Sequence, residues 1–298
     1  MRITSEVMVN RSLDRLQSRI QAYERSQSEL GTGKKILKPS DDPTGARRAM
    51  SLRNALGSHE RNLNNISDAR GYLDATDSQL QSALDRVGRA RELTTRAASH
   101  TNAGDRQALA SELREIREEL TGIANARHQD RPLFAGWSTG NAVEEDPDVG
   151  FVGTGEQISR RISDSEKVRI NVTAGEWLSL DGATGDGSDL LSTLDGLVEQ
   201  LEAGAPSGDI SPRIDQFKAF ADNISAELAQ IGATTNRVDS ARDRAEDQRL
   251  TVRTELSEVE DVDVAEGVME LQVQQVGYEA TLQALSQALP PSLVAFMR

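Results

Sequence analysis

The stretch Leu30-Gly-Thr-Gly-Lys-Lys-Ile-Leu-Lys-Pro-Ser-Asp-Asp-Pro-Thr-Gly-Ala46 separates two helical patterns near the start of this 298-residue chain. Its first glycines favour the end of a helix, and its prolines prevent that helix from continuing. Asp42 followed by Pro43 is a strong helix start, because aspartate caps free N–H groups and proline lacks one. The stretch therefore predicts an elbow between two helices, marked by Gly33, Pro39, Ser40, Asp41, Asp42 and Pro43.

Apolar residues recur at spacings of three and four near both ends of the chain. This spacing places side chains on one face of a helix, as in coiled coils. The C-terminal pattern begins after a change of register at Glu260 to Asp263, and it closes at a pair of prolines. We predict two assembly seams: Val9, Leu13, Leu16, Ile20, Tyr23 and Leu30 in the first, and Val264, Val268, Leu271, Tyr278, Leu282, Leu285 and Leu289 in the second.

Between the two ends, leucine-rich helical patterns flank one segment of different composition. Residues 137–187 are rich in Gly, Asp, Ser and Thr, and Val168, Ile170 and Val172 alternate with polar residues. Such alternation is typical of half-buried antiparallel strands. The expected fold is mainly α, a long antiparallel helical bundle or coiled coil formed by the N- and C-terminal regions, with a small antiparallel β insert. We divide it into a terminal assembly domain (1–42 with 260–298), a helical rod (43–136 with 188–259) and an outer β domain (137–187).

The charge is distributed unevenly along this acidic chain of net charge −14. Residues 1–61 carry a net charge of +5, whereas residues 239–298 carry −7. The acidic run from Glu255 to Glu270 would lie near the basic elbow if the two ends form an antiparallel hairpin. A lone amphipathic helix is marginal in water, so we expect the ends to become ordered mainly on assembly.

Composition and motif spacing exclude several functional classes. The chain has no cysteine, which removes disulfides, zinc–thiolate sites and thiol nucleophiles. Three scattered histidines predict no metal site, and Gly31-Thr-Gly-Lys-Lys35 lacks the spacing of a phosphate loop. The acidic balance disfavours nucleic acid, and no apolar run approaches the roughly 20 residues of a membrane span. We expect no catalytic residue, cofactor, membrane insertion or cleavable signal peptide.

Three stretches together resemble the flagellin superfamily of bacterial axial proteins: residues 1–29, the elbow sequence and residues 271–298. Within this superfamily, Leu133-Phe-Ala-Gly136, the short insert beginning Gly150-Phe-Val-Gly153 and the run Ser257 to Glu266 are more similar to hook–filament junction proteins than to filament flagellins. Two departures, Trp137 and the ending Ser292 to Arg298, do not separate these two classes.

The resemblance implies a structural subunit that leaves the cell through the flagellar type III apparatus without cleavage. Its implied partners are further copies of itself in a ring, the adjacent hook-associated junction protein, flagellin, and an export chaperone at the C-terminal helix. Its implied place is the extracellular hook–filament junction. Filament flagellin is the alternative within the superfamily, and a cytoplasmic coiled-coil scaffold or an enzyme with an unrecognised site is the alternative outside it.

Overall fold

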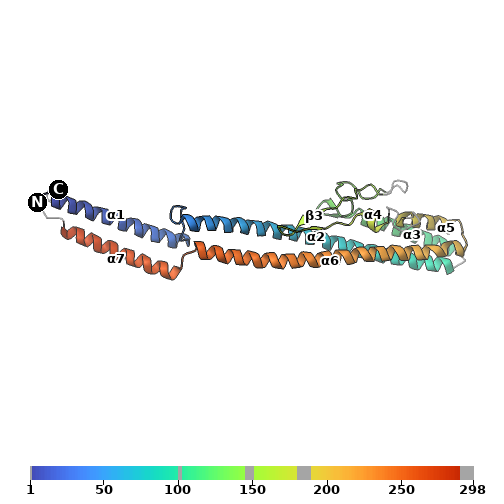
Figure 1. The fold of residues 1–298 in the computed structure, drawn as a ribbon. Helices are drawn as coiled ribbons and strands as arrows, with labels where there is room; N and C mark the ends of the chain where they lie inside the picture. The colour runs from blue at the N-terminus through green and yellow to red at the C-terminus, as the bar shows by residue number, and fades with distance from the viewer. Residues whose placement is uncertain (1, 100–102, 145–150, 180–188, 289–298) are drawn as a thin grey trace, which may run out of the picture. The chain divides into compact units, whose positions relative to one another are not determined.

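The computed structural model describes the chain except for residues 1, 100–102, 145–150, 180–188 and 289–298 (Figure 1). The described part is mainly helical with a small antiparallel sheet in the insert, as the sequence predicted, and it has a second small sheet just before the insert. Its elements are α1 (Arg2–Thr32), α2 (Pro43–Ser99), α3 (Ala103–Ala124), β1 (Arg127–His128), β2 (Arg131–Pro132), β3 (Ser159–Arg161), β4 (Lys167–Arg169), α4 (Ala174–Trp177), α5 (Leu190–Glu202), α6 (Ser207–Glu260) and α7 (Val264–Ala288).

Two compact units make up the chain, and the division into three domains stays a prediction. Unit 1 comprises residues 1–58 and 248–298, and unit 2 comprises residues 59–247, so α2 and α6 each contribute to both. The buried side chains Ile162, Val168 and Trp177 of the β insert belong to the same apolar core as the helices of unit 2. Shared burial of apolar surface explains why the contacts group them together.

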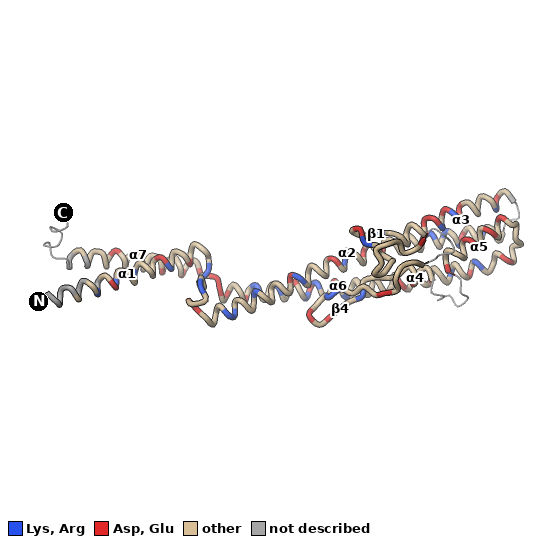
Figure 2. Tube along the Cα trace, turned by 90° about the horizontal axis from the view of Figure 1, so that it is seen from above, with Lys and Arg blue, Asp and Glu red and all other residues tan. Residues whose placement is uncertain are grey.

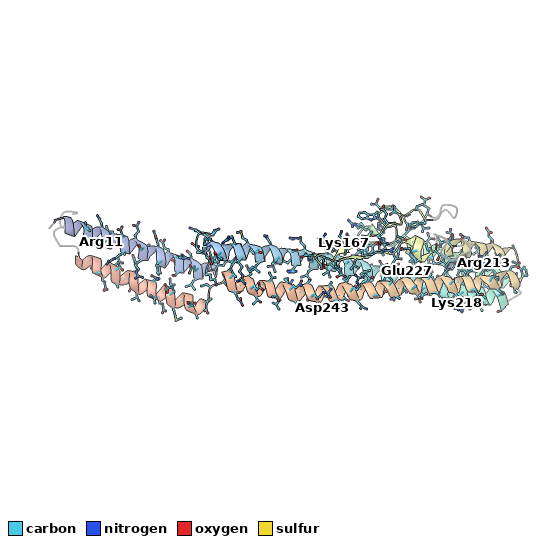
Figure 3. The ribbon with its side chains drawn as sticks, viewed as in Figure 1. Arg11, Lys167, Arg213, Lys218, Glu227 and Asp243 are labelled. Carbon is cyan, nitrogen blue, oxygen red and sulfur yellow. The ribbon has the colours of Figure 1, made fainter. Side chains whose placement is uncertain are left out.

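Unit 2 contains the apolar core of the described residues. Three helices contribute fully buried side chains to it: Leu73 and Leu80 of α2, Leu113 of α3 and Phe217 of α6. Arg117 of α3 pairs with Asp195 of α5 at 2.7 Å beside this core. Figure 3 shows the side chains along these helices, including Arg213 of α6, which lies against Gly196 of α5.

An aromatic pair and an ion pair stabilise the β insert. Phe134 and Trp177 pack edge to face, with their ring centroids 5.6 Å apart, and both are fully buried. Arg169 of β4 pairs with Glu176 of α4 at 2.5 Å. Nearby on α6, Glu227 is half-buried, and burial first and the charge of Glu176 second raise its pKa above the ordinary value. The two hairpins pair in simple register, Arg127 with Pro132 and Arg160 with Val168.

Candidate assembly interface

The helices α1 and α7 of unit 1 lie side by side and run antiparallel (Figure 1). At one end of the pair, Lys34 forms a β-bridge with Asp261, and further along Arg19 Nη1 donates to Gln274 Oε1 at 3.1 Å. From the first contact to the second, the residue number falls on the α1 side and rises on the α7 side. The two helices therefore run in opposite directions. The terminal segments therefore form a hairpin of two helices.

Only part of each predicted seam lies in the contact between these helices. Leu16, Ile20, Tyr23, Leu30, Leu271 and Tyr278 are half-buried, whereas Leu13, Val264, Val268 and Leu282 are exposed. A single neighbouring helix covers only a narrow face, so a pair of helices leaves these four side chains open. That neighbouring subunits cover them stays a prediction. The side chains of Val9 and Leu285, and Leu289 as a whole, lie outside the described residues.

The contact also uses residues that the apolar pattern did not identify. Gln274 of α7 accepts the hydrogen bond from Arg19 of α1. Two glycines of α7 lie against side chains of α1, Gly267 against Leu30 and Gly277 against Arg19. A glycine inside a helix costs about 1 kcal/mol relative to alanine. A glycine at such a position in the sequence therefore indicates that another helix packs closely there.

The elbow joins α1 to the end of α6 through backbone hydrogen bonds. Lys35 N–H donates to the carbonyl of Glu260 at 2.7 Å, and Val262 N–H donates to the carbonyl of Gly33 at 3.0 Å. Gly33 adopts a φ of 71°, which only glycine adopts readily. The basic elbow and the acidic run are thus in direct contact, as their charges suggested (Figure 2).

The second half of the elbow makes the start of α2. Asp42 Oδ1 accepts hydrogen bonds from the N–H groups of Thr44 and Gly45 at 3.0 and 2.9 Å, and Pro43 is the first helical residue. Asp41 accepts from Lys38 N–H at 2.8 Å and stabilises the turn before it. Pro39 and Ser40 are exposed in the same turn. Asp42 therefore has the capping role that its sequence position predicted.

Glu260 is the buried charge of the elbow, with only 4% of its surface exposed. Its carboxylate pairs with Lys34 Nζ at 3.1 Å and with Arg53 Nη2 at 2.5 Å. Burial alone would raise its pKa, but the hydrogen bonds and charges of Lys34 and Arg53 outweigh it, so the pKa lies below the ordinary value. The sequence marked the acidic run without distinguishing this residue from its neighbours.

The exposed apolar residues concentrate in unit 1. All but two of the large hydrophobic side chains that are exposed in the described part lie there, the exceptions being Trp137 and Val152. Among the described residues of unit 1, the buried hydrophobic ones are Ala46 and Ala49. Six of these exposed hydrophobic side chains lie on α7: Val264, Val268, Met269, Val273, Val276 and Leu282. We call these six side chains the open α7 surface.

The described residues contain no group of three potential metal ligands from His, Cys, Asp and Glu. None of the described helices combines the length and the apolarity that crossing a membrane requires.

Comparison with known proteins gives a consistent family. Residues 3–139 match the bacterial flagellin N-terminal helical region, and residues 214–297 match the bacterial flagellin C-terminal helical region. The chain is 22% identical to flagellar hook-associated protein 3 of Escherichia coli K12, over 96% of each chain. It is also 22% identical to flagellin of Bacillus subtilis 168, over 97% of this chain and 96% of the relative.

The fold is similar to a solved structure of a putative flagellar hook-associated protein from Vibrio parahaemolyticus. The TM-score is 0.69 at 19% identity, and the match covers 74% of this chain and all of that one. Proteins with these two helical regions are structural components of flagella, so the chain is a structural protein and not an enzyme. The matched regions contain α1, the elbow and α7, the elements that build the candidate interface. The chain therefore belongs to the bacterial flagellin family.

Proposed function

We propose that the chain is a structural subunit of the junction between the flagellar hook and filament, the class called FlgL or hook-associated protein 3. Its relative in Escherichia coli carries that name and aligns over nearly the whole of both chains. In this proposal, copies of the chain form a ring through their terminal helices. The ring would contact the adjacent hook-associated junction protein on one side and flagellin on the other.

The observation that carries the assembly role is the incomplete burial of unit 1. In the described part, its helices expose valines, leucines and methionines, and their buried hydrophobic residues are alanines. An exposed apolar surface of this kind is typical of a protein–protein contact. Neighbouring subunits would cover the open α7 surface and complete a core that one chain does not provide.

The same surface bears on export. A chain that exposes apolar side chains before assembly is prone to aggregate, so a chaperone on the C-terminal helix would protect it. We propose that this chaperone covers the open α7 surface, that the flagellar type III apparatus exports the subunit without cleavage, and that the subunit then resides at the extracellular junction. Extracted hooks and filaments should contain the chain at its full mass.

The alternative role is filament flagellin. It is supported by the identity of 22% to flagellin of Bacillus subtilis, which equals the identity to the Escherichia coli relative. The two roles differ in how far assembly continues. A flagellin grows into long filaments when seeded, whereas a junction subunit stops after one layer. Seeded polymerisation of the purified chain, followed by electron microscopy, distinguishes them.

Deletion of the chain from its own host tests the junction role directly. We expect cells that retain hooks and release flagellin monomers into the medium, because filament subunits would lack a base on which to assemble. Cells with hooks and no released flagellin would instead identify the chain as the filament subunit. Detection of the protein only in the cytosol would contradict both roles.

A variant pair tests the open α7 surface. Val273→Asp with Val276→Asp places two charges on exposed positions of α7, where we expect little change in monomer stability, within about 0.5 kcal/mol. Incorporation into the junction should fall strongly, because assembly would bury unpaired carboxylates. Val152→Asp, an exposed valine of unit 2, is the control and should assemble normally. Normal incorporation of the double variant would contradict a role of this surface.

A further inference from the structure

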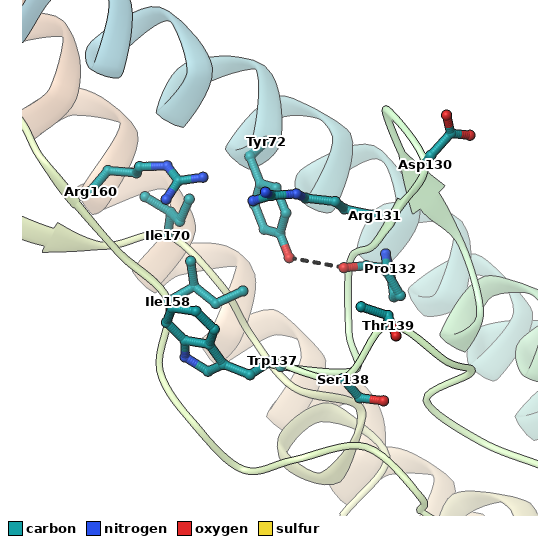
Figure 4. A pocket seen from close by; sticks show the side chains of 11 residues that line it. Tyr72, Asp130, Arg131, Pro132, Trp137, Ser138, Thr139, Ile158, Arg160 and Ile170 are labelled. Carbon is teal, nitrogen blue, oxygen red and sulfur yellow. Dashed lines mark hydrogen bonds between the residues drawn. The ribbon is translucent and has the colours of Figure 1, made fainter. Parts of the chain in front are cut away.

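Unit 2 contains a pocket of about 390 Å³ between α2, the β1–β2 hairpin and the start of the β insert (Figure 4). It lies apart from the candidate assembly interface of unit 1 in the sequence, because all of its lining residues belong to unit 2. Its walls combine cationic, aromatic and aliphatic side chains: Tyr72, Arg131, Trp137, Ile158, Arg160 and Ile170. A pocket of this size with a few converging polar groups fits a small ligand or one unit of a polymer.

Two arginines give the pocket a positive charge within an acidic protein. Arg131 and Arg160 have no ion-pair partner among the described residues, whereas Arg70 of α2 and Arg169 of β4 are both paired. Both lie close enough to the Tyr72 ring for their charges to act on its pKa, which burial raises to about 12. The acidic side chain at the rim, Asp130, points away from the pocket (Figure 4). The uncompensated guanidinium groups favour an anion such as a carboxylate or a phosphate.

The opposite wall carries an exposed indole. Trp137 is 64% exposed, whereas Trp177 is fully buried in the core of the insert. The indole is held in place, because Trp137 N–H donates to Thr154 Oγ1 at 2.8 Å and its Nε1–H donates to the carbonyl of Gln157 at 3.4 Å. An oriented aromatic face next to polar groups suits a ligand with a flat, C–H-bearing ring.

The hairpin that carries Arg131 is strained. Gln129 and Asp130 both have positive φ values, 49° and 62°, in a turn where glycine or asparagine is usual. The carbonyl of Asp130 accepts a hydrogen bond from Arg127 Nη2 at 2.5 Å, which holds the turn beside the pocket. Backbone strain next to a pocket with unpaired charges is the pattern found at binding sites.

We propose that this pocket binds a carboxylated sugar unit of the uronic-acid type. The two guanidinium groups would take the carboxylate, the Trp137 ring would stack on the sugar ring, and the hydroxyls of Ser138 and Thr139 would bind its hydroxyl groups. A free phosphate would use the arginines without the indole. An acidic peptide would use the arginines but offers no flat ring of hydroxyls, so the sugar acid uses the most features of the site.

Fluorescence titration of the full chain tests the proposal. The protein has two tryptophans and only Trp137 is exposed, so its emission reports on the pocket. The probe is a trimer of galacturonic acid, and the matched neutral probe is a trimer of galactose. We expect a saturable change with the acidic trimer that weakens at high salt, and at least tenfold weaker binding of the neutral trimer.

Variants link binding to the named residues. Arg131→Gln and Arg160→Gln should each weaken binding of the acidic trimer about tenfold or more, as expected for a lost charge-assisted hydrogen bond. Trp137→Phe should remove the fluorescence signal, with weaker binding by saturation-transfer NMR. Arg91→Gln is the control, because Arg91 is exposed on α2 and does not line the pocket. The substitution removes the same charge at a position outside the site.

Several outcomes would overturn the proposal. These are no binding of the acidic trimer to the unmodified chain, equal binding of the neutral trimer, unchanged binding in both pocket arginine variants, or tighter binding of a triglutamate peptide or inorganic phosphate. Near-ultraviolet circular dichroism checks the fold of each variant. If a variant is misfolded, the comparison of acidic and neutral trimers on the unmodified chain still decides.

Discussion

At the residue scale, Glu260 is the position where one side chain holds two segments together. Its carboxylate joins Lys34 of the elbow and Arg53 of α2, and its carbonyl accepts from Lys35 N–H. A buried carboxylate is unfavourable unless it is paired, so removing its charge weakens both contacts at once.

Glu260→Gln should lower the stability of the elbow by about 1–2 kcal/mol, because charge-assisted hydrogen bonds become neutral ones. Hydrogen exchange at the amides of Lys35 and Val262, which donate across the elbow, measures this locally. Glu258→Gln is a matched control: it removes the same charge two residues away, where only the backbone carbonyl bonds to Lys35. Equal effects of the two substitutions would show that the pairing of Glu260 is unimportant.

The pH dependence of the elbow follows from the same residue. The pKa of Glu260 is lower in the folded chain than its ordinary value, so its contribution is complete above that value, about 4.3. The contribution is lost as the pH falls through the lower, folded-state pKa. Exchange protection at Lys35 and Val262 should therefore decline below about pH 4, and the decline should be smaller in Glu260→Gln. A decline centred near pH 6 would contradict this assignment.

At the element scale, glycine stabilises the turn at Gly136 but destabilises the long helix α2 at Gly88. Gly136 has a φ of 63°, and a Cβ atom there would lie 2.1 Å from the carbonyl oxygen of Thr154. Gly88 lies inside α2, is exposed, and has no heavy atom near the corresponding position. The first glycine is required by backbone geometry, and the second costs helix stability.

Gly136→Ala should therefore destabilise unit 2 by more than about 2 kcal/mol, because a positive φ and a backbone collision act together. Gly88→Ala should stabilise the same unit by about 0.5–1 kcal/mol. Denaturant unfolding followed by circular dichroism measures both changes. A neutral Gly136→Ala would mean that the turn relaxes, and a destabilising Gly88→Ala would mean that α2 has a neighbour at that position.

At the scale of the whole molecule, the two units differ in how much apolar surface each buries. Unit 2 contains the large buried side chains, whereas the buried hydrophobic residues of unit 1 in the described part are alanines. Because burial of apolar surface is the dominant stabilising contribution, unit 1 should open at a lower free energy than unit 2.

Hydrogen exchange of the isolated chain tests this difference. We expect amides of α1 and α7 to exchange much faster than those of α2 around Leu80 and of α3 around Leu113, and to gain protection on assembly. Strong protection of residues 2–30 in the monomer would contradict the view that the ends become ordered mainly on assembly. The core helices of unit 2 serve as the internal control in the same experiment.

The long helices and the β insert were predictable, because their signals are local, whereas the short hairpin β1–β2 and the one-turn helix α4 were not predicted. Asp42 and Pro43 mark the start of α2, and the change of register at Glu260 to Asp263 separates α6 from α7. The alternation of Val168 and Ile170 with polar residues indicates the strands of the insert. Local signals depend on neighbouring residues along the chain, so the sequence contains them in full. The family and its structural role followed from the elbow and the two ends.

The sequence by itself determined the helices, their breaks, the small insert and the opposite charges of the two ends. Only the tertiary structure decided which face of α7 meets α1, that Glu260 is the buried acid of the acidic run, and that Arg131, Arg160 and Trp137 line one pocket. A helical stripe is wider than the surface that one neighbour covers, so periodicity identifies apolar residues without showing which of them are covered. The pocket joins residues from α2, a hairpin and the insert, and their proximity arises only when the chain folds.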